Sequence, residues 1–101
     1  MRAAWLLLLG GCATVMVDGW KLGKDRWDYD RAQVTKRAAF ELQCPPESLT
    51  LYVLSVYSGT ITSQQIGVDG CGHKLVYRNS IDGWVFDSAD GLAKLQKAVD
   101  R

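Results

Sequence analysis

An uncharged apolar run at the start of the chain constrains which residues remain to build a folded domain. It covers residues 3–17, follows Arg2 and contains four consecutive leucines. These 15 residues are fewer than the ~18–20 that a helix needs to cross a bilayer, and Gly10 and Gly11 would weaken such a helix. A buried core helix is the alternative, but the leucines leave it no polar face. A charged start, a short apolar centre and small residues after it are typical of a secretory signal peptide.

The run closes with Leu9-Gly10-Gly11-Cys12, a junction that resembles the lipobox of bacterial lipoproteins. In that family the cysteine thiol receives a diacylglycerol, the signal is cut before the cysteine, and the new amino terminus is acylated. The resemblance implies lipidation of Cys12 and a membrane partner reached through this lipid. Because Ala13 and not an aspartate follows, it also implies the periplasmic face of the outer membrane. Ordinary secretion, with cleavage near Ala13 or later, is the alternative.

Removal of the predicted signal peptide, residues 1–11, leaves 90 of the 101 residues, enough for one small domain. Such a domain buries about 60–65% of its unfolded surface, so it usually needs a cross-link, a metal or a partner. Arg2 is removed too, and 11 basic and 11 acidic side chains remain. Zero net charge argues against a nucleic-acid partner, which needs a basic face to displace counterions from phosphates.

Cys44 and Cys71 are an even pair in a chain expected to be exported, provided that Cys12 is lipidated. Thiols that enter an oxidising compartment tend to pair, so the sequence predicts a Cys44–Cys71 disulfide. Closing its loop of 26 intervening residues stabilises the fold by roughly 3–4 kcal/mol in the chain-entropy model. A metal site with His73 is the alternative, but it lacks a fourth ligand at suitable spacing.

Residues 12–28 are interpreted as the lipidated cysteine and a tether, because glycines break any helix and charged side chains keep the stretch in water. Two tryptophans do not suit a mere spacer. We expect Trp27 to pack on the domain and Trp20 to lie at the lipid headgroups, where indoles are favoured.

A helix is predicted over about residues 29–42, with Asp28 or Asp30 as its cap and two prolines after its end. Spacings of three and four predict a buried stripe, made up of Ala32, Thr35, Ala39 and Leu42 with Ala38 beside it. A basic run on its outer side is interpreted as a solvated face; it consists of Arg31, Lys36 and Arg37.

Alternating and turn-forming residues after the helix predict a chain of short strands and a last helix. The strands are expected at about 48–57, 60–68, 74–78 and 84–86, and the helix at 89–101. The first strand is apolar on both faces, which predicts a central position. Residues 29–101 are therefore predicted to form a small two-layer α+β domain. It consists of a three- to four-stranded antiparallel meander, one disulfide, and both helices on one face of the sheet.

Residues 38–78 resemble a pattern found in small bacterial envelope proteins. In these proteins a helix ends in Cys-Pro (here Cys44-Pro45), a strand follows, and a Gly-Cys-Gly turn (residues 70–72) precedes a strand that carries a tyrosine (Tyr77). The relatives often have a further cysteine two residues later, where this chain has Asn79. The resemblance implies a disulfide-pinned envelope domain and no catalytic role.

Few residues offer catalytic or metal-binding chemistry. His73 is the single histidine, and a surface or hydrogen-bonded role is the simpler interpretation. Asp82, Asp87 and Asp90 offer oxygen ligands for calcium, but the order of an EF-hand is absent, and a turn followed by a helix cap explains them. The sequence predicts no catalytic residues, no cofactor and no metal.

Two classes of function stay open. The favoured one is a non-enzymatic envelope lipoprotein that binds or supports an envelope protein partner through its sheet face or an exposed edge strand. The alternatives are a small exported enzyme, an accessory subunit of one, or a freely secreted disulfide-bonded domain.

Overall fold

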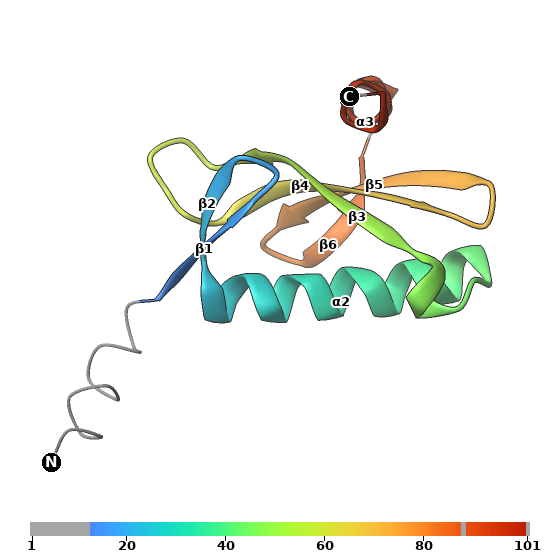
Figure 1. Ribbon diagram of the computed structural model, residues 1–101, viewed down its shortest axis with the longest axis horizontal. Coiled ribbons are helices and arrows are strands. Elements are labelled where there is room, and N and C mark those ends of the chain that lie inside the picture. Colours follow the sequence, from blue (N-terminus) through green and yellow to red (C-terminus); the bar gives the residue numbers. More distant parts are fainter. Residues whose placement is uncertain (1–12, 88, 101) are drawn as a thin grey trace, which may run out of the picture.

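The computed structural model describes residues 13–87 and 89–100, and the side chains of all of these except 89 and 90 (Figure 1). The predicted signal peptide and Cys12 lie outside the described residues. The elements in chain order are β1 (Thr14–Val17), β2 (Trp20–Gly23), α2 (Lys24–Leu42), the short 3-10 helix η1 (Pro46–Ser48), β3 (Thr50–Val56), β4 (Ser63–Gly70), β5 (His73–Ser80), β6 (Gly83–Phe86) and α3 (Ala89–Val99).

The main sheet is an antiparallel meander in the order β3-β4-β5-β6. Two-residue turns connect its later strands. In the β4–β5 turn both residues, Cys71 and Gly72, have left-handed backbone, with φ of 52° and 80°. The predicted α+β class, the four-stranded meander and the disulfide are confirmed.

α2 covers one face of this sheet (Figure 1). Its buried side chains include Trp27, Val34 and Ala38, which recur at helical spacing. They form a core with side chains from the sheet, namely Val53, Ile66, Val68, Tyr77 and Trp84. Trp27 therefore packs on the domain as predicted.

The buried stripe predicted for this helix is wrong by several positions. Ala32 is exposed, and Thr35 and Ala39 are only half-buried. The bulkier residues Trp27 and Val34 win the inward side because they bury more apolar area than alanine and threonine do. Ala32, Thr35 and Ala39 instead form a second, partly uncovered face of α2, whereas Ala38 and Leu42 pack in or against the core as predicted.

The start of α2 also differs from the prediction. The helix begins at Lys24, so Asp28 and Asp30 lie within it and do not cap it. Asp30 is completely buried, and Arg26 Nε donates to both of its carboxylate oxygens at 3.0 Å. Ser63 Oγ donates to the same carboxylate at 3.3 Å. A buried carboxylate needs such partners, because moving an unpaired charge out of water costs about several kcal/mol.

α3 lies on the face of the sheet opposite α2, so the prediction of two helices on one face is wrong (Figure 1). Neighbouring residues of a strand point to opposite faces. On β4, Ile66 belongs to the core under α2, whereas Gly67 lies against the buried side chain of Leu95 from α3. The domain thus has three layers, because α2 already fills one face and the other still has to be covered.

The segment predicted as a tether is folded from Thr14 onward. β1 and β2 form an antiparallel hairpin in which Leu22 is buried and Trp20 packs against the core. Its turn is Asp18-Gly19, with φ of 52° and 83°. Asp-Gly is a strong signal for such a turn, since both residues tolerate left-handed backbone. The expected place of Trp20 at the lipid headgroups is therefore replaced by packing on the domain.

The disulfide joins the end of α2 to the β4–β5 turn. Gln43 ends the helix in left-handed conformation, and Cys44 follows, 6.0 Å from Cys71 between Cα atoms. Cys44 is buried whereas Cys71 lies in the exposed turn. The bond therefore holds the carboxyl end of α2 against the sheet.

We expect the double substitution Cys44→Ser and Cys71→Ser to lower the free energy of unfolding by about 3–4 kcal/mol, because the unfolded chain regains the freedom of the closed loop. Urea unfolding of the wild-type chain and the double variant measures the difference, with the reduced wild-type chain as the matched control. A loss below about 1 kcal/mol in both would contradict this role.

Gly67→Ala should loosen the docking of α3. A Cβ at this position would lie 2.5 Å from Leu95 Cδ1, so overpacking should cost about 1–3 kcal/mol in urea unfolding. The double variant Gly67→Ala, Leu95→Ala removes the clash and should be less destabilised than the sum of the two single variants. Strictly additive effects would show that the two residues do not meet.

Candidate functional site

β3 is an edge strand of the main sheet, not a central one as its sequence predicts. Both of its faces are apolar because one helix covers each face of the sheet, not because strands flank both of its edges. An edge strand presents a row of backbone groups that can pair with a further strand.

The outward backbone groups of β3 are identified by one hydrogen bond. Val53 N–H donates to the carboxylate of Asp18 at 2.7 Å, so Val53 directs its backbone groups away from β4. In an antiparallel ladder the direction alternates from residue to residue. Leu51 therefore also directs its N–H and C=O toward the outer edge, and Thr50 and Tyr52 direct theirs to β4.

The β1–β2 hairpin places Asp18 at this edge. The left-handed backbone of its turn projects the carboxylate toward β3, where it accepts the hydrogen bond from Val53. Asp18 thus covers one donor near the middle of β3. Among the described residues, no side chain makes the same contact with Leu51.

A groove of about 800 Å³ lies between this edge and α2. We call it the edge groove. Its helix side includes Ala32, Thr35 and Ala39, three residues that were wrongly predicted to be buried in the core. Trp27 and Leu51 contribute apolar walls. The groove is open because these helix side chains are too small to reach β3.

The charged side chains that line the edge groove are basic. Arg31 and Lys36 line it, and none of the described lining residues is acidic. Arg31 lies 3.6 Å from Asp28, whose carboxylate also accepts a hydrogen bond from Lys24 at 2.9 Å. This hydrogen bond lowers the pKa of Asp28 and raises that of Lys24. Lys36 has no ion pair within residues 13–87 and 89–100.

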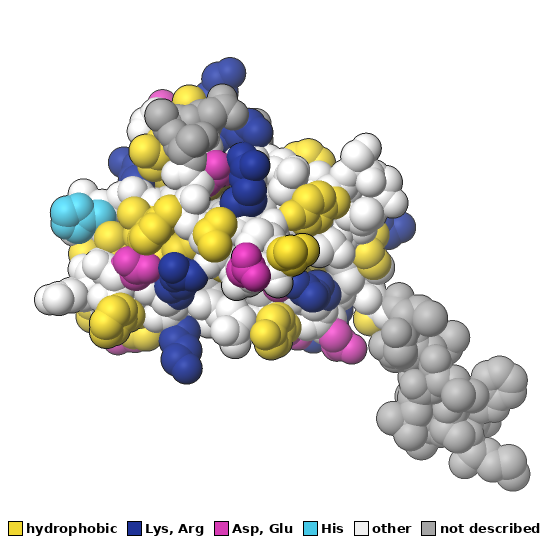
Figure 2. Space-filling model, turned by 180° about the vertical axis from the view of Figure 1, so that it is seen from behind, with side chains coloured by type: hydrophobic (Ala, Val, Ile, Leu, Met, Phe, Trp, Pro, Cys, Tyr) yellow, Lys and Arg dark blue, Asp and Glu magenta, His cyan; other side chains and the backbone are white. Residues whose placement is uncertain are grey.

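A second groove, of about 660 Å³, lies between α2 and the β5–β6 turn. Phe40 and Ile81 are highly exposed there, beside charged lining residues such as Lys36 and Asp82. Figure 2 shows that apolar and charged side chains alternate on the face seen from behind. Its arginines are already engaged. Arg26 pairs with Asp30, and Arg37 pairs with Glu41 and donates to the Trp84 carbonyl at the edge of β6. Lys36 lines this groove as well as the edge groove, and Asp82 adds an acidic side chain, so the charges here are mixed whereas those of the edge groove are basic.

The structure does not bring the other predicted candidates together. His73 is exposed at the start of β5. Asp82 is exposed in the turn before β6, whereas Asp87 follows the end of that strand. The side chain of Asp90 lies outside the described residues, as does Cys12. Over the described part of the chain, no group of His, Cys, Asp and Glu side chains has the arrangement of a metal site.

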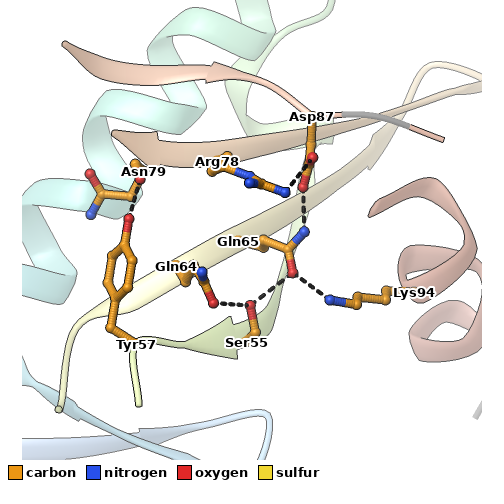
Figure 3. Close-up of polar contacts among 8 residues, drawn as sticks. All are labelled: Ser55, Tyr57, Gln64, Gln65, Arg78, Asn79, Asp87 and Lys94. Atoms are coloured by element: carbon orange, nitrogen blue, oxygen red, sulfur yellow. Dashed lines mark hydrogen bonds and ion pairs between the residues drawn. The ribbon is translucent and has the colours of Figure 1, made fainter. Parts of the chain in front are cut away.

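A buried polar network under α3 was not predicted from the sequence (Figure 3). Gln65 of β4 is buried, and its carbonyl accepts hydrogen bonds from Ser55 at 2.8 Å and from Lys94 of α3 at 3.0 Å. Its amide donates to Asp87, which also accepts from Arg78 at 3.1 Å. The network fastens α3 to three strands and is best interpreted as structural. A glutamine in an apolar strand was its only signal.

Comparison of the chain with protein-family models, with curated proteins and with solved structures finds no match. Across the described residues, none of the helices combines the length and apolar character needed to span a bilayer. The function therefore has to be inferred from the geometry of the domain and from the sequence motifs.

Tyr77 is the one described buried side chain whose polar atom has no hydrogen-bond partner. Its ring is buried under α2 and stacks on Phe86 at 5.3 Å. Burial and, to a lesser degree, the negative charge of Glu41 raise the pKa of its phenol to about 12, whereas the nearby Arg37 lowers it. The neutral phenol is therefore the form that the fold favours.

We expect Tyr77→Phe to be neutral or stabilising, because it removes an unsatisfied hydroxyl from the core. In the wild-type chain the contribution of Tyr77 to stability is complete below pH 10 and is lost as pH rises toward about 12. The variant should lack this loss when unfolding free energy is measured against pH. Tyr57→Phe is the control, since its hydroxyl donates to the Asn79 carbonyl and its removal should cost about 1 kcal/mol.

Proposed function

We propose that the chain is a membrane-anchored lipoprotein of the bacterial envelope, with a folded domain that acts as a non-enzymatic interaction module. The observation that carries this proposal is the Cys44–Cys71 disulfide. The chain has three cysteines, so this bond leaves Cys12 as the one thiol available for a lipid. A disulfide also suits an exported domain, because such bonds persist in oxidising compartments.

The arrangement of the chain after Cys12 supports an anchor held close to the domain. Ala13 alone separates Cys12 from β1, and the Ala13 carbonyl accepts a hydrogen bond from Lys24 N–H at 3.2 Å. The first described residue is thus attached to the start of α2. A lipid on Cys12 would hold the β1–β2 end of the domain next to the membrane. The residue after Cys12 favours the periplasmic face of the outer membrane.

An interaction role is supported by the exposed edge of β3 and the edge groove beside it. These features offer backbone pairing and apolar contact, which are means of binding a protein. An exported enzyme would instead need a nucleophile or a general acid and base within hydrogen-bond reach of one another. No such constellation supports that alternative among the described side chains.

The test is the intact mass of the protein isolated from cell membranes, measured before and after reduction. We expect a chain that starts at Cys12, carries a lipid increment and gains two hydrogens on reduction. Cys12→Ser should remove the lipid and release the protein from the membrane fraction, whereas Cys44→Ser with Cys71→Ser should leave the lipid in place. A mature chain that starts beyond Cys12 without lipid would refute the anchor and favour free secretion.

A further inference from the structure

We propose that the edge groove binds an extended, acidic segment of a partner protein, which adds to the sheet as a fifth strand beside β3. This inference rests on the proposed role as an interaction module and specifies the chemistry of its partner. Three features carry it: the outward backbone groups of β3, the room between β3 and α2, and the charge of the side chains around that room.

The backbone of β3 can pair with an added strand at Leu51. Its N–H and C=O point away from β4, as the alternation from Val53 requires. In an antiparallel sheet, the N–H and C=O of one such residue both form hydrogen bonds with a single residue of the neighbouring strand. Asp18 occupies Val53 N–H with a carboxylate oxygen, the same kind of acceptor that an incoming backbone carbonyl would supply. The edge is therefore covered at one position and accessible at the next.

The edge groove accommodates side chains of the added strand. Every second side chain of that strand would point toward α2. There it would meet Ala32, Thr35 and Ala39, whose small side chains leave about 800 Å³ of open space. Apolar side chains of medium size fit this space against Leu51 and Trp27. Burial of a valine or leucine side chain contributes roughly 1.5–3 kcal/mol.

The charges around the groove decide between an acidic partner and a second copy of this chain. Arg31 and Lys36 are its charged lining residues, so carboxylates on the added strand would find opposite charge. In a symmetric pairing of two β3 edges, both α2 helices would lie on the same face of the continuous sheet. Arg31 and Lys36 of both copies would then crowd one gap. Like charges placed together disfavour that pairing, and the acidic partner is the better occupant.

The test is a titration of the isotope-labelled full chain, in nonionic detergent, with synthetic peptides of about six residues, the usual length of a strand. One peptide alternates glutamate with valine, and the second alternates lysine with valine. Two further versions of the acidic peptide carry N-methyl groups on one or the other set of alternate amides. Amide NMR shifts and hydrogen exchange report where each peptide binds.

We expect the acidic peptide to bind at least about tenfold more tightly than the lysine peptide, to slow exchange of the Leu51 amide, and to weaken with salt. One of the N-methylated versions should lose binding, because only one set of amides faces β3. Asp18→Gly keeps a turn residue that tolerates left-handed backbone and exposes Val53 N–H, so it should tighten binding. Asp18→Asn keeps an acceptor and serves as its control.

Lys36→Glu should remove most of the preference for the acidic peptide, because Arg31 and the new glutamate then carry opposite charges. Lys97→Glu is the matched control, because Lys97 is an exposed lysine of α3 on the opposite face of the sheet. Far-ultraviolet circular dichroism checks that each variant is folded.

Equal affinity for both peptides, tolerance of both N-methylated versions, or absence of binding at millimolar peptide would overturn the proposal. Protection of the Leu51 amide that increases with protein concentration in the absence of peptide would also overturn it, and would show that a second copy of this chain pairs with β3. These outcomes are independent of the mass measurement on Cys12. A lipidated chain that binds no peptide retains the anchor and loses the edge site, and an unlipidated chain that binds does the reverse.

Discussion

The architecture depends on β4, whose two faces meet two different helices. Ile66 and Val68 point into the core under α2. The residue between them, Gly67, has no side chain and so leaves room for Leu95 of α3 on the opposite face. Burial of both faces makes β4 the centre of three layers in a chain of modest size. With β4 enclosed in this way, the disulfide fastens the end of α2 to the turn that follows this same strand. The Gln65 network fastens α3 from the other side.

Sequence patterns predicted the elements better than their arrangement. Alternating apolar residues and glycine turns sufficed for the meander, and an even pair of cysteines sufficed for the disulfide. They could not assign α3 to a face, because the apolar side of a short helix fits either side of a sheet. The double apolar face of β3 was equally ambiguous, since helices and neighbouring strands bury a strand in different directions.

Two errors of the sequence analysis concern residues in or next to the candidate site. Gly19 was interpreted as a helix breaker, although Asp-Gly between alternating residues is a hairpin signal. The alanines of α2 were assigned to the core because their spacing is helical, but Trp27 and Val34 compete for the same inward side and are larger. The edge groove is therefore a consequence of two overlapping apolar patterns on one helix, of which the bulkier is buried. The helical spacing of these small residues was correctly detected, but they line the edge groove and do not pack into the core.

The two edges of the sheet are protected unequally. At the β6 edge the strand is short, and Arg37 donates to the outward carbonyl of Trp84. At the β3 edge the strand is longer, and Asp18 covers Val53 while Leu51 keeps its outward groups without a described partner. An added strand is therefore directed to one edge, beside the basic groove, and a continuous ladder of copies through both edges is disfavoured.

The hydrogen bond between the Ala13 carbonyl and Lys24 N–H limits how far the domain can search for a partner. A long flexible linker spreads a module over a large volume and dilutes it, whereas a short one concentrates it near its attachment point. With lipid on Cys12 as proposed, the domain would move with its anchor in two dimensions and keep one end toward the bilayer. Partners that share the membrane, or that present a strand within a domain's width of its surface, would meet β3 at high effective concentration. More distant components would be beyond its reach.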